Sequence, residues 1–316
     1  MHDYLSTPRK VTFENFFQTT GKDDFQGIYR WHQVLSSSFL AVMNDFEIVL
    51  RNTVHFALSA HYCPNNSDSF DWMGISVISA QNAPMHIPHQ LNGRRRNNQN
   101  GSVSYTGSLG KLQDAIYQLN QAGKAVSPDA VVAKLTFAFW PNAINQLRHR
   151  SFNQIRQSVL QNMFPHAPSH DISFINQLRD LLDKVRLLRN RLGHHDSLLK
   201  FREISPTGTA GFIPQKPRHT IHSLKIMIDN MANILNWIDS GLVARLKASD
   251  HWHRLEALLT QEVVGYYRYN NGKACCYERA VAYKNNVEQA KKYQARVKYR
   301  RAKYPKEHKQ IMKYHF

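Results

Sequence analysis

Two apolar stripes of helical period organise the sequence. Within residues 30–62, apolar side chains recur every three or four positions, at Leu35, Phe39, Met43, Phe46, Leu50, Val54 and Leu58. Within residues 172–192 the same spacing is found at Phe174, Leu178, Leu181, Val185, Leu188 and Leu192. Residues spaced in this way share one face of an α-helix. The pattern therefore predicts two long amphipathic helices, each with one buried face.

Shorter helical patterns fill much of the remaining chain, and we predict further helices at residues 109–122, 143–163 and 221–248. Another helix is expected to begin at Ser127, because serine caps helices and Pro128 and Asp129 suit a first turn. Pro141 is expected to mark a boundary or kink. No set of alternating strands and no internal repeat is found, so the predicted fold class is all-α.

Large aromatic side chains gather near the predicted helices, and we interpret them as core. They are Trp31, Phe39, Phe46, Phe137, Phe139 and Trp140. Residues 84–110 have no sustained period and are rich in Gly, Asn and Ser, which predicts a mobile basic loop. We therefore expect a helical domain at residues 1–250 and a basic, partly helical extension at residues 251–316.

The net charge is unusually positive for a chain of this length. The 316 residues hold 41 Lys and Arg against 23 Asp and Glu, a formal net charge of +18. Residues 281–316 carry eleven Lys or Arg and two Glu, which is half of that charge. A protein this basic attracts polyanions, of which nucleic acid is the commonest.

We expect the basic segments to contact RNA, because cations neutralise phosphates and the interleaved tyrosines can stack on bases. The candidate RNA-binding residues are Arg94, Arg95, Arg96, Lys291, Lys292, Arg296, Lys298, Arg300, Arg301 and Lys303. Such runs are also often merely solvated. The tail could instead adsorb to anionic lipid, at about 1 kcal/mol per cation. It lacks a sustained apolar face, which favours RNA over a membrane partner.

Cysteine content and apolar runs limit the class of protein. The three cysteines, Cys63, Cys275 and Cys276, are too few for a disulfide framework, and none forms a C-x-x-C motif. The first residues lack the pattern of a signal peptide, and no apolar run approaches the roughly 20 residues that span a bilayer. We expect a soluble, reduced, cytoplasmic protein.

The stretch LRNRLGHHDSLL, residues 188–199, concentrates polar chemistry at the end of the second long helix. An arginine fork can stabilise a crowded anionic phosphate, and an imidazole can accept or donate a proton near neutral pH. On a straight helix Arg189 and His194 would point about 140° apart. We expect Gly193 to let the backbone depart from that geometry. One Arg and one His are still few groups for cleaving RNA, so a partner chain would supply the rest.

Simpler interpretations of this stretch exist. Basic residues near a helix C-terminus interact well with its negative end, and composition alone favours a solvated cap for His194 and His195. Paired histidines can also bind metal, but adjacent positions point apart on a helix. Apart from Asp196, no acidic or cysteine partner accompanies them at ligand spacing. We therefore predict no zinc site and no cofactor.

A second polar set lies on the first long helix. Glu47, Arg51 and His55 follow one another at spacings of four, so they share a helix face. A glutamate and an arginine at that spacing form an ordinary stabilising surface pair. This is our preferred interpretation of Glu47 and Arg51, with a place in the functional site as the second one.

The stretch RNRLGHH resembles the R-N-x-x-x-H signature of HEPN-domain ribonucleases and, more closely, the corresponding stretch of the Abi-like (abortive infection) family. Four further stretches fall in the order and rough spacing of that family: YLSTPRKVTFENFF, WHQVLSSSFLAVMNDFEIVLRNTVHFALSAHY, SPDAVVAKLTFAFW and NILNWIDSGL. The resemblance covers about residues 4–245. Gly193 stands where the family usually has alanine, Asp196 where it often has Glu, and the LTFAFW stretch lacks the usual glycine.

The resemblance implies a HEPN-like helical bundle with additional helices that acts as a homodimer. Two copies of the motif would meet to form one composite, metal-independent endoribonuclease site. Arg189 would bind the scissile phosphate, Asn190 would position, and His194, or else His195, would be the acid–base group. Cleavage by 2′-hydroxyl attack would leave a 2′,3′-cyclic phosphate and a 5′-hydroxyl. The family also places a polar position of the first long helix near this site, which makes Glu47 and Arg51 second-tier candidates.

Three functions follow as hypotheses from the sequence. The first is a toxin or phage-defence endoribonuclease, which would need a noncoding RNA or a protein as antitoxin. The second is a non-catalytic HEPN-fold protein that holds a structured RNA. The third is an interaction protein that reads lipid through its basic tail. Loss of RNA cleavage in Arg189→Ala, with RNA binding kept, would favour the first.

Overall fold

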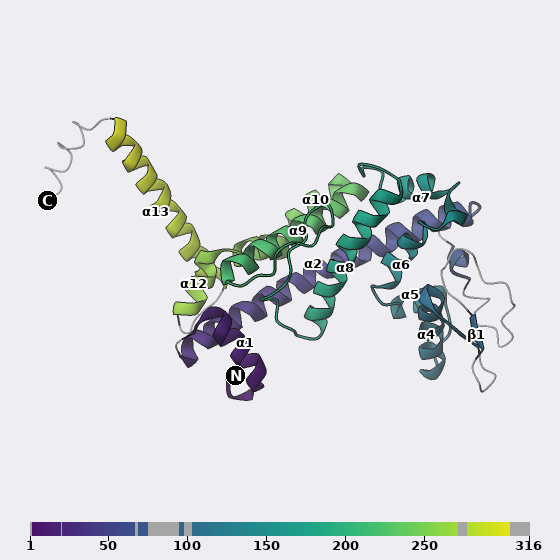
Figure 1. Ribbon diagram of the computed structural model, residues 1–316, viewed down its shortest axis with the longest axis horizontal. Coiled ribbons are helices and arrows are strands. Elements are labelled where there is room, and N and C mark those ends of the chain that lie inside the picture. Colours follow the sequence, from purple (N-terminus) through teal and green to yellow (C-terminus); the bar gives the residue numbers. More distant parts are fainter. Residues whose placement is uncertain are drawn as a thin grey trace.

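The protein is almost entirely helical in the part of the chain that the computed structural model describes, residues 2–19, 21–66, 69–74, 95–97, 103–270 and 277–303 (Figure 1). Its helices are α1 (Thr7–Phe17), α2 (Lys22–Tyr62), α4 (Gly107–Gln121), α5 (Pro128–Lys134), α6 (Phe139–Gln146), α7 (Arg156–Met163), α8 (Ile172–Gly193), α9 (Pro217–Ile238), α10 (Ser240–Lys247), α11 (Asp250–Leu258), α12 (Gln261–Tyr269) and α13 (Tyr277–Lys303). Three short 3₁₀ turns span His2–Tyr4, Asp71–Met73 and Arg150–Phe152. The all-α prediction is confirmed.

The helix α2 runs along the length of the helical body, and α8 crosses it (Figure 1). Its 41 residues span about 60 Å at the rise of an α-helix. All members of the two predicted apolar stripes are buried, and so are the six aromatic residues assigned to the core. The pattern therefore located the core correctly, although α2 begins eight residues before the predicted start at residue 30.

Two predicted helices are each broken in two. The pattern at 143–163 continues through residues 147–155, but Arg156 folds back over that stretch, donating from Nε to the Leu147 carbonyl at 2.7 Å and from Nη2 to Asn153 Oδ1 at 2.6 Å. Pro141 lies in the first turn of α6, where a proline is tolerated, so it marks a start rather than a kink. The pattern at 221–248 breaks at Asp239, whose carboxylate caps α10.

The prediction of a mobile loop at 84–110 is corrected over its second half. Residues 84–94 lie outside the described residues. The strands β1 (Arg95–Asn97) and β2 (Val103–Tyr105) pair antiparallel with Arg95 opposite Tyr105, and α4 begins at Gly107. The Tyr105 backbone N–H donates to Gln113 Oε1 at 3.0 Å, which ties the strand to that helix. A short hairpin was missed because three residues per strand are too few for a periodicity signal.

The helical body extends past the expected boundary at residue 250. Both α11 and α12 lie against α2, and the Trp31 indole donates to the Leu258 carbonyl at 2.9 Å. A Cβ at Gly27 would lie 1.9 Å from the Tyr267 carbonyl oxygen, so only glycine permits this approach of α12 to α2. The helix α13 then projects away from the body (Figure 1).

The segment that follows α8 is fixed by polar side chains of α9. The Thr220 hydroxyl donates to the Leu199 carbonyl, and the Ser223 hydroxyl donates to the Phe201 carbonyl at 2.6 Å. The Asn230 amide donates to the Ile204 carbonyl at 2.9 Å. These buried bonds satisfy a backbone that forms no regular structure, and they hold the end of α8 in place. Among the described helices, none is long and apolar enough to cross a membrane.

Candidate functional site

The last turn of α8 ends in a hydrogen-bond pattern that places a histidine in a left-handed conformation. The Asp196 N–H donates to the Arg191 carbonyl at 2.7 Å, and the His195 N–H donates to the Leu192 carbonyl at 3.1 Å. These two bonds form a Schellman motif, in which the left-handed residue is most often glycine. Here that residue is His195, with φ of 55°, while Gly193 remains helical. Our expectation that Gly193 releases the backbone is therefore wrong, because the departure occurs two residues later.

Arg189 lies along the last turn of α8 and faces α2. Its Nη1 is 3.9 Å from the position that a Cβ on Gly193 would occupy, so the guanidinium reaches the turn that precedes His194. Its Nε lies 3.9 Å from Glu47 Oε2, and the two side chains are 44% and 26% exposed. No other hydrogen bond or ion pair of Arg189 is found among the described residues. Most of its five N–H donors therefore remain available to an anion.

Arg191, in contrast, supports the fold. Its Nη1 donates to the Ser197 carbonyl at 3.1 Å, and its guanidinium lies over the Phe201 ring at 5.5 Å from the centroid. Burial lowers the pKa of Arg191, and the nearby Asp196 carboxylate counteracts that effect. Of the two arginines beside Asn190, only Arg189 is free to bind a ligand.

Asn190 and the two histidines lie at the same end of α8 as Arg189. Asn190 is half-buried, and its carbonyl accepts the His194 N–H at 2.9 Å. Both histidine side chains are exposed. The turn thus gathers all four candidate residues, although no hydrogen bond joins the Arg189 and His194 side chains in the described structure.

The three polar residues on α2 make different contacts. Glu47 approaches Arg189, and within the described part of the chain it forms no ion pair with Arg51, so our preferred interpretation as a Glu–Arg surface pair is wrong. Arg51 Nε donates to Asn52 Oδ1 at 3.3 Å instead. His55 is buried, where its Nδ1 accepts from the Trp72 indole at 3.0 Å.

The structure adds two residues that the sequence interpretation missed, His32 on α2 and Arg9 on α1. The Leu198 N–H donates to His32 Nε2 at 3.1 Å, and Arg9 Nη2 donates to the His195 carbonyl at 2.5 Å. Through these two contacts, side chains of α1 and α2 hold the backbone of the segment after α8. Burial, and then the Arg9 charge, lower the pKa of His32 to about 4, so the ring is neutral at physiological pH.

The neutral state of His32 makes stability depend on pH. The unfolded chain protonates this residue near pH 6.5, whereas the folded chain does so only near pH 4. The unfolded state binds more protons between these values, so stability is complete above pH 6.5 and falls towards pH 4. The expected loss at His32 is ~3 kcal/mol. His32→Gln keeps an acceptor for the Leu198 N–H without the titration.

Urea denaturation at several pH values checks this expectation. The free energy of unfolding of the wild type should fall more steeply than that of His32→Gln from pH 6.5 to 4. Other groups titrate alike in both proteins, so the difference isolates His32. Parallel curves would contradict the assignment of a neutral His32.

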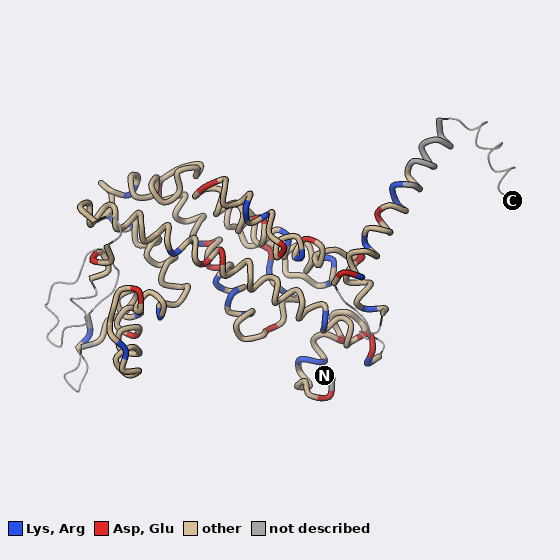
Figure 2. The backbone as a smooth tube through the Cα atoms, turned by 180° about the vertical axis from the view of Figure 1, so that it is seen from behind, with Lys and Arg blue, Asp and Glu red and all other residues tan. Residues whose placement is uncertain are grey.

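The predicted RNA-binding cations are only partly described. Arg94 lies outside the described residues, Arg95 is known by its backbone position in β1, and Arg96 is exposed. Lys292 is exposed, but Lys291 Nζ forms a 2.5 Å ion pair with Glu262 on α12, which anchors α13. The remaining candidates belong to the distal end of α13: Arg296, Lys298, Arg300, Arg301 and Lys303. Figure 2 marks in blue the Lys and Arg of this helix that lie closer to the body.

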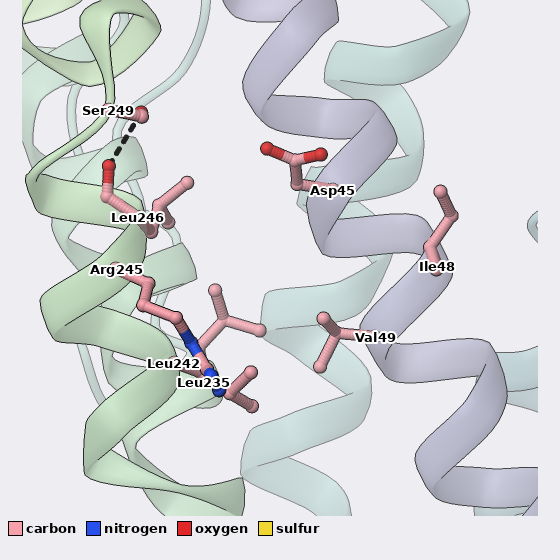
Figure 3. Close-up of a pocket in the computed structure, with 8 residues that line it drawn as sticks. All are labelled: Asp45, Ile48, Val49, Leu235, Leu242, Arg245, Leu246 and Ser249. Carbon is pink, nitrogen blue, oxygen red and sulfur yellow. Dashed lines mark hydrogen bonds between the residues drawn. The ribbon is translucent and has the colours of Figure 1, made fainter.

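Two clefts lie beside α2. One, of about 440 Å³, lies beside the end of α8 and includes His32, Arg9 and His195. The other, of about 250 Å³, lies between α2, α9 and α10 and is lined mainly by leucine, isoleucine and valine side chains, with Asp45 and Arg245 among them (Figure 3). Of the four motif residues, His195 lines the first cleft, and none lines the second. Among the described residues, no three of His, Cys, Asp and Glu lie together as metal ligands.

One comparison with known proteins gives a result. A family model described as Abi-like protein matches residues 1–200, which include α1, α2, α8 and the whole RNRLGHH stretch. No curated protein and no solved structure matches the chain. The match covers more than half of the sequence and ends a few residues beyond the turn at His195.

Proposed function

Because the chain belongs to the Abi-like protein family, we propose that it is a metal-independent endoribonuclease that acts in phage defence. Membership in the family indicates a role in abortive infection. The proposal adds the reaction, the substrate class and the residues. It assigns α2 and α8 to a HEPN-like bundle in which the end of α8 carries the chemistry.

The proposal rests on the exposure of Arg189 and on how few contacts its side chain makes. Its guanidinium is exposed, reaches the turn before His194 and has a single long contact to Glu47. Arg191, two residues later on α8, is bound to the Ser197 carbonyl instead. An arginine held by one carboxylate and otherwise open to solvent is suited to a phosphate oxygen, which its planar fork can bind at two points.

The reaction follows from these groups. His194 accepts the proton of a ribose 2′-hydroxyl, and the oxygen attacks the adjacent phosphorus. The bond from phosphorus to the 5′-oxygen breaks, and that oxygen takes a proton from the protonated form of an acid–base histidine. Arg189 stabilises the additional negative charge on the phosphate, and Asn190 orients these side chains. The products are a 2′,3′-cyclic phosphate and a 5′-hydroxyl.

The proposal includes a homodimer. One chain presents a single Arg189 and a single His194, whereas the reaction needs one group to accept a proton and another to donate one. Two copies of the α8 turn facing each other supply both. Sedimentation of the purified chain measures the fraction of dimer at each concentration. The RNA cleavage rate per chain, measured at the same concentrations, is expected to rise with that fraction.

Incubation of RNA with the purified chain in EDTA tests the activity. Cleavage by the wild type supports the proposal. The alternative, a non-catalytic RNA-binding protein, is favoured by the basic helix α13, whose Lys and Arg are in large excess over its Glu. Tight RNA binding without cleavage at any chain concentration would favour that alternative.

We expect Lys and Arg side chains of α13 to contact RNA phosphates. The salt dependence of the Kd for RNA measures the number of these contacts. Each cation that neutralises a phosphate of single-stranded RNA contributes about 0.7 to the slope of log Kd against log salt concentration. A variant with four cations of α13 replaced by glutamine is expected to lower that slope by about 3. The four are Lys298, Arg300, Arg301 and Lys303.

A matched variant removes the same charge elsewhere. It replaces Lys111, Lys124, Lys134 and Arg148, which lie in and around α4–α6, away from α13 in Figure 1. Its slope is expected to stay close to that of the wild type. Equal losses in the two variants would mean that overall charge, and not α13, attracts RNA.

A further inference from the structure

The cleft beside the α8 turn has the size and lining of a ligand site. Its volume of about 440 Å³ falls within the range of pockets that hold small molecules. Three elements contribute polar side chains to it: Arg9 from α1, His32, Gln33 and Ser36 from α2, and His195 from the turn after α8. Arg9 is already fixed to the turn through the His195 carbonyl.

His32 gives this cleft an unused hydrogen-bond donor. The ring is buried, and its Nε2 accepts the Leu198 N–H. A neutral imidazole that accepts at Nε2 carries its proton on Nδ1. Among the described residues, no acceptor is found for that Nδ1–H, although His32 lines the cleft. A ligand with an acceptor atom in the cleft can therefore bind this N–H.

One face of α2 connects the cleft to Arg189, which lies on α8. Gln33, Ser37, Leu40, Asn44 and Glu47 follow one another at spacings of four and three, the repeat of a single helix face. The first three line the cleft, and Glu47 contacts Arg189. Ser37 and Glu47 are ten residues apart, which is about 15 Å along the helix. A short single strand can span that distance.

We propose that this cleft binds one nucleotide of single-stranded RNA, next to the phosphate that Arg189 holds. The inference rests on the proposed function and adds a base-reading site to it. The His32 Nδ1–H donates to an acceptor on the base, and the Gln33 amide offers one donor group and one acceptor. Arg9 lies at the cleft with further N–H donors for the phosphate. A base can enter only if it is unpaired, because pairing would occupy the edge that these groups contact.

Binding of short oligonucleotides tests the inference without cleavage. Eight-nucleotide 2′-fluoro strands of A, C, G or U lack the attacking hydroxyl, so their Kd values can be measured with the full wild-type chain by fluorescence anisotropy. We expect one base to bind more tightly than the others. In Gln33→Ala the preferred strand should bind about tenfold more weakly, with the preference reduced, since a two-point base contact discriminates by about that factor.

Gln118→Ala is the matched control. Gln118 is an exposed glutamine on α4, far from the cleft, and its replacement should leave all four Kd values unchanged. Both glutamines are exposed helical residues, so neither substitution should unfold the chain. Thermal unfolding of both variants checks this.

Two results would overturn the inference. One is equal affinity of the wild type for all four strands together with unchanged binding in Gln33→Ala. The other is binding of a free nucleoside monophosphate as tight as that of the preferred strand, which would make the ligand a free nucleotide instead of RNA.

The inference and the proposed function can fail separately. A base preference that depends on Gln33, in a chain that cuts no ordinary RNA, would support the cleft and contradict the nuclease. Cleavage of ordinary RNA with the same cut positions in wild type and Gln33→Ala would support the nuclease and contradict the cleft.

Discussion

Replacement of Arg189 with alanine is expected to lower the rate of RNA cleavage by about 10²–10³-fold, the usual cost of removing a group that stabilises transition-state charge. Arg189 is the arginine that the fold leaves open, with only Glu47 near its Nε. The loss should appear in the cleavage rate at saturating RNA, while the Kd for RNA changes little, because many other cations contribute to binding. Arg189→Lys keeps the charge without the planar fork and should fall between the two.

A neighbouring arginine provides the control for this prediction. Arg186 lies one turn earlier on α8, is exposed in the same way and pairs with Asp183 at 3.2 Å. Arg186→Ala removes the same charge from the same helix and should cleave at close to the wild-type rate. Equal losses in the two variants would show that the rate responds to the overall charge of α8 and would contradict the role given to Arg189.

The second large effect is expected at His194. His194→Ala should lower the cleavage rate by about 10²–10⁴-fold, because it removes the group that moves protons. His194 is the first residue after α8, exposed and next to the glycine that the Arg189 guanidinium approaches. The cleavage rate of an oligonucleotide, measured against pH for wild type and variant, separates this role from a loss of folding. The wild-type rate should vary with pH, and the residual rate of the variant should not vary in the same way.

His195 provides the comparison, because its backbone is strained. His195→Gly removes the cost of a left-handed residue and should raise the free energy of unfolding by about 1 kcal/mol. If His194 is the acid–base group, His195→Gly should retain most of the cleavage rate. Retained activity in His194→Ala together with lost activity in His195→Gly would exchange the roles of the two histidines.

The sequence predicted the elements that rest on long repeats of side-chain type. Both long helices and their buried faces follow from spacings of three and four, because an apolar helix face packs against the core of a globular protein. The breaks at residues 147–155 and at Asp239 do not follow from spacing. They depend on single polar side chains, Arg156 and Asp239, that bind backbone groups, and the apolar pattern continues through them unchanged.

In the candidate site too, some residues could be predicted from the sequence and others could not. Arg189, Asn190, His194 and His195 are neighbours in the chain, so a motif could identify them. Residues from other helices meet them only through the tertiary fold: Arg9 comes from α1 and His32 and Glu47 from α2. The polar positions at spacings of four on α2 were a usable signal, because His32 and Ser36, like Gln33 and Ser37, repeat with the period of one helix face. The left-handed His195 could not be predicted, since the usual glycine signal stands two residues earlier.

The measurement that tests the central claim most directly uses one RNA oligonucleotide and its copy with a single 2′-deoxy nucleotide at the cleavage position, both in EDTA. The account predicts that the wild type cuts the first to a 2′,3′-cyclic phosphate and a 5′-hydroxyl and leaves the second intact at that position. Arg189→Ala and His194→Ala should cut neither at a comparable rate. Cleavage that continues at the deoxy position and leaves a 5′-phosphate would contradict attack by the 2′-hydroxyl, and with it the roles assigned to both residues.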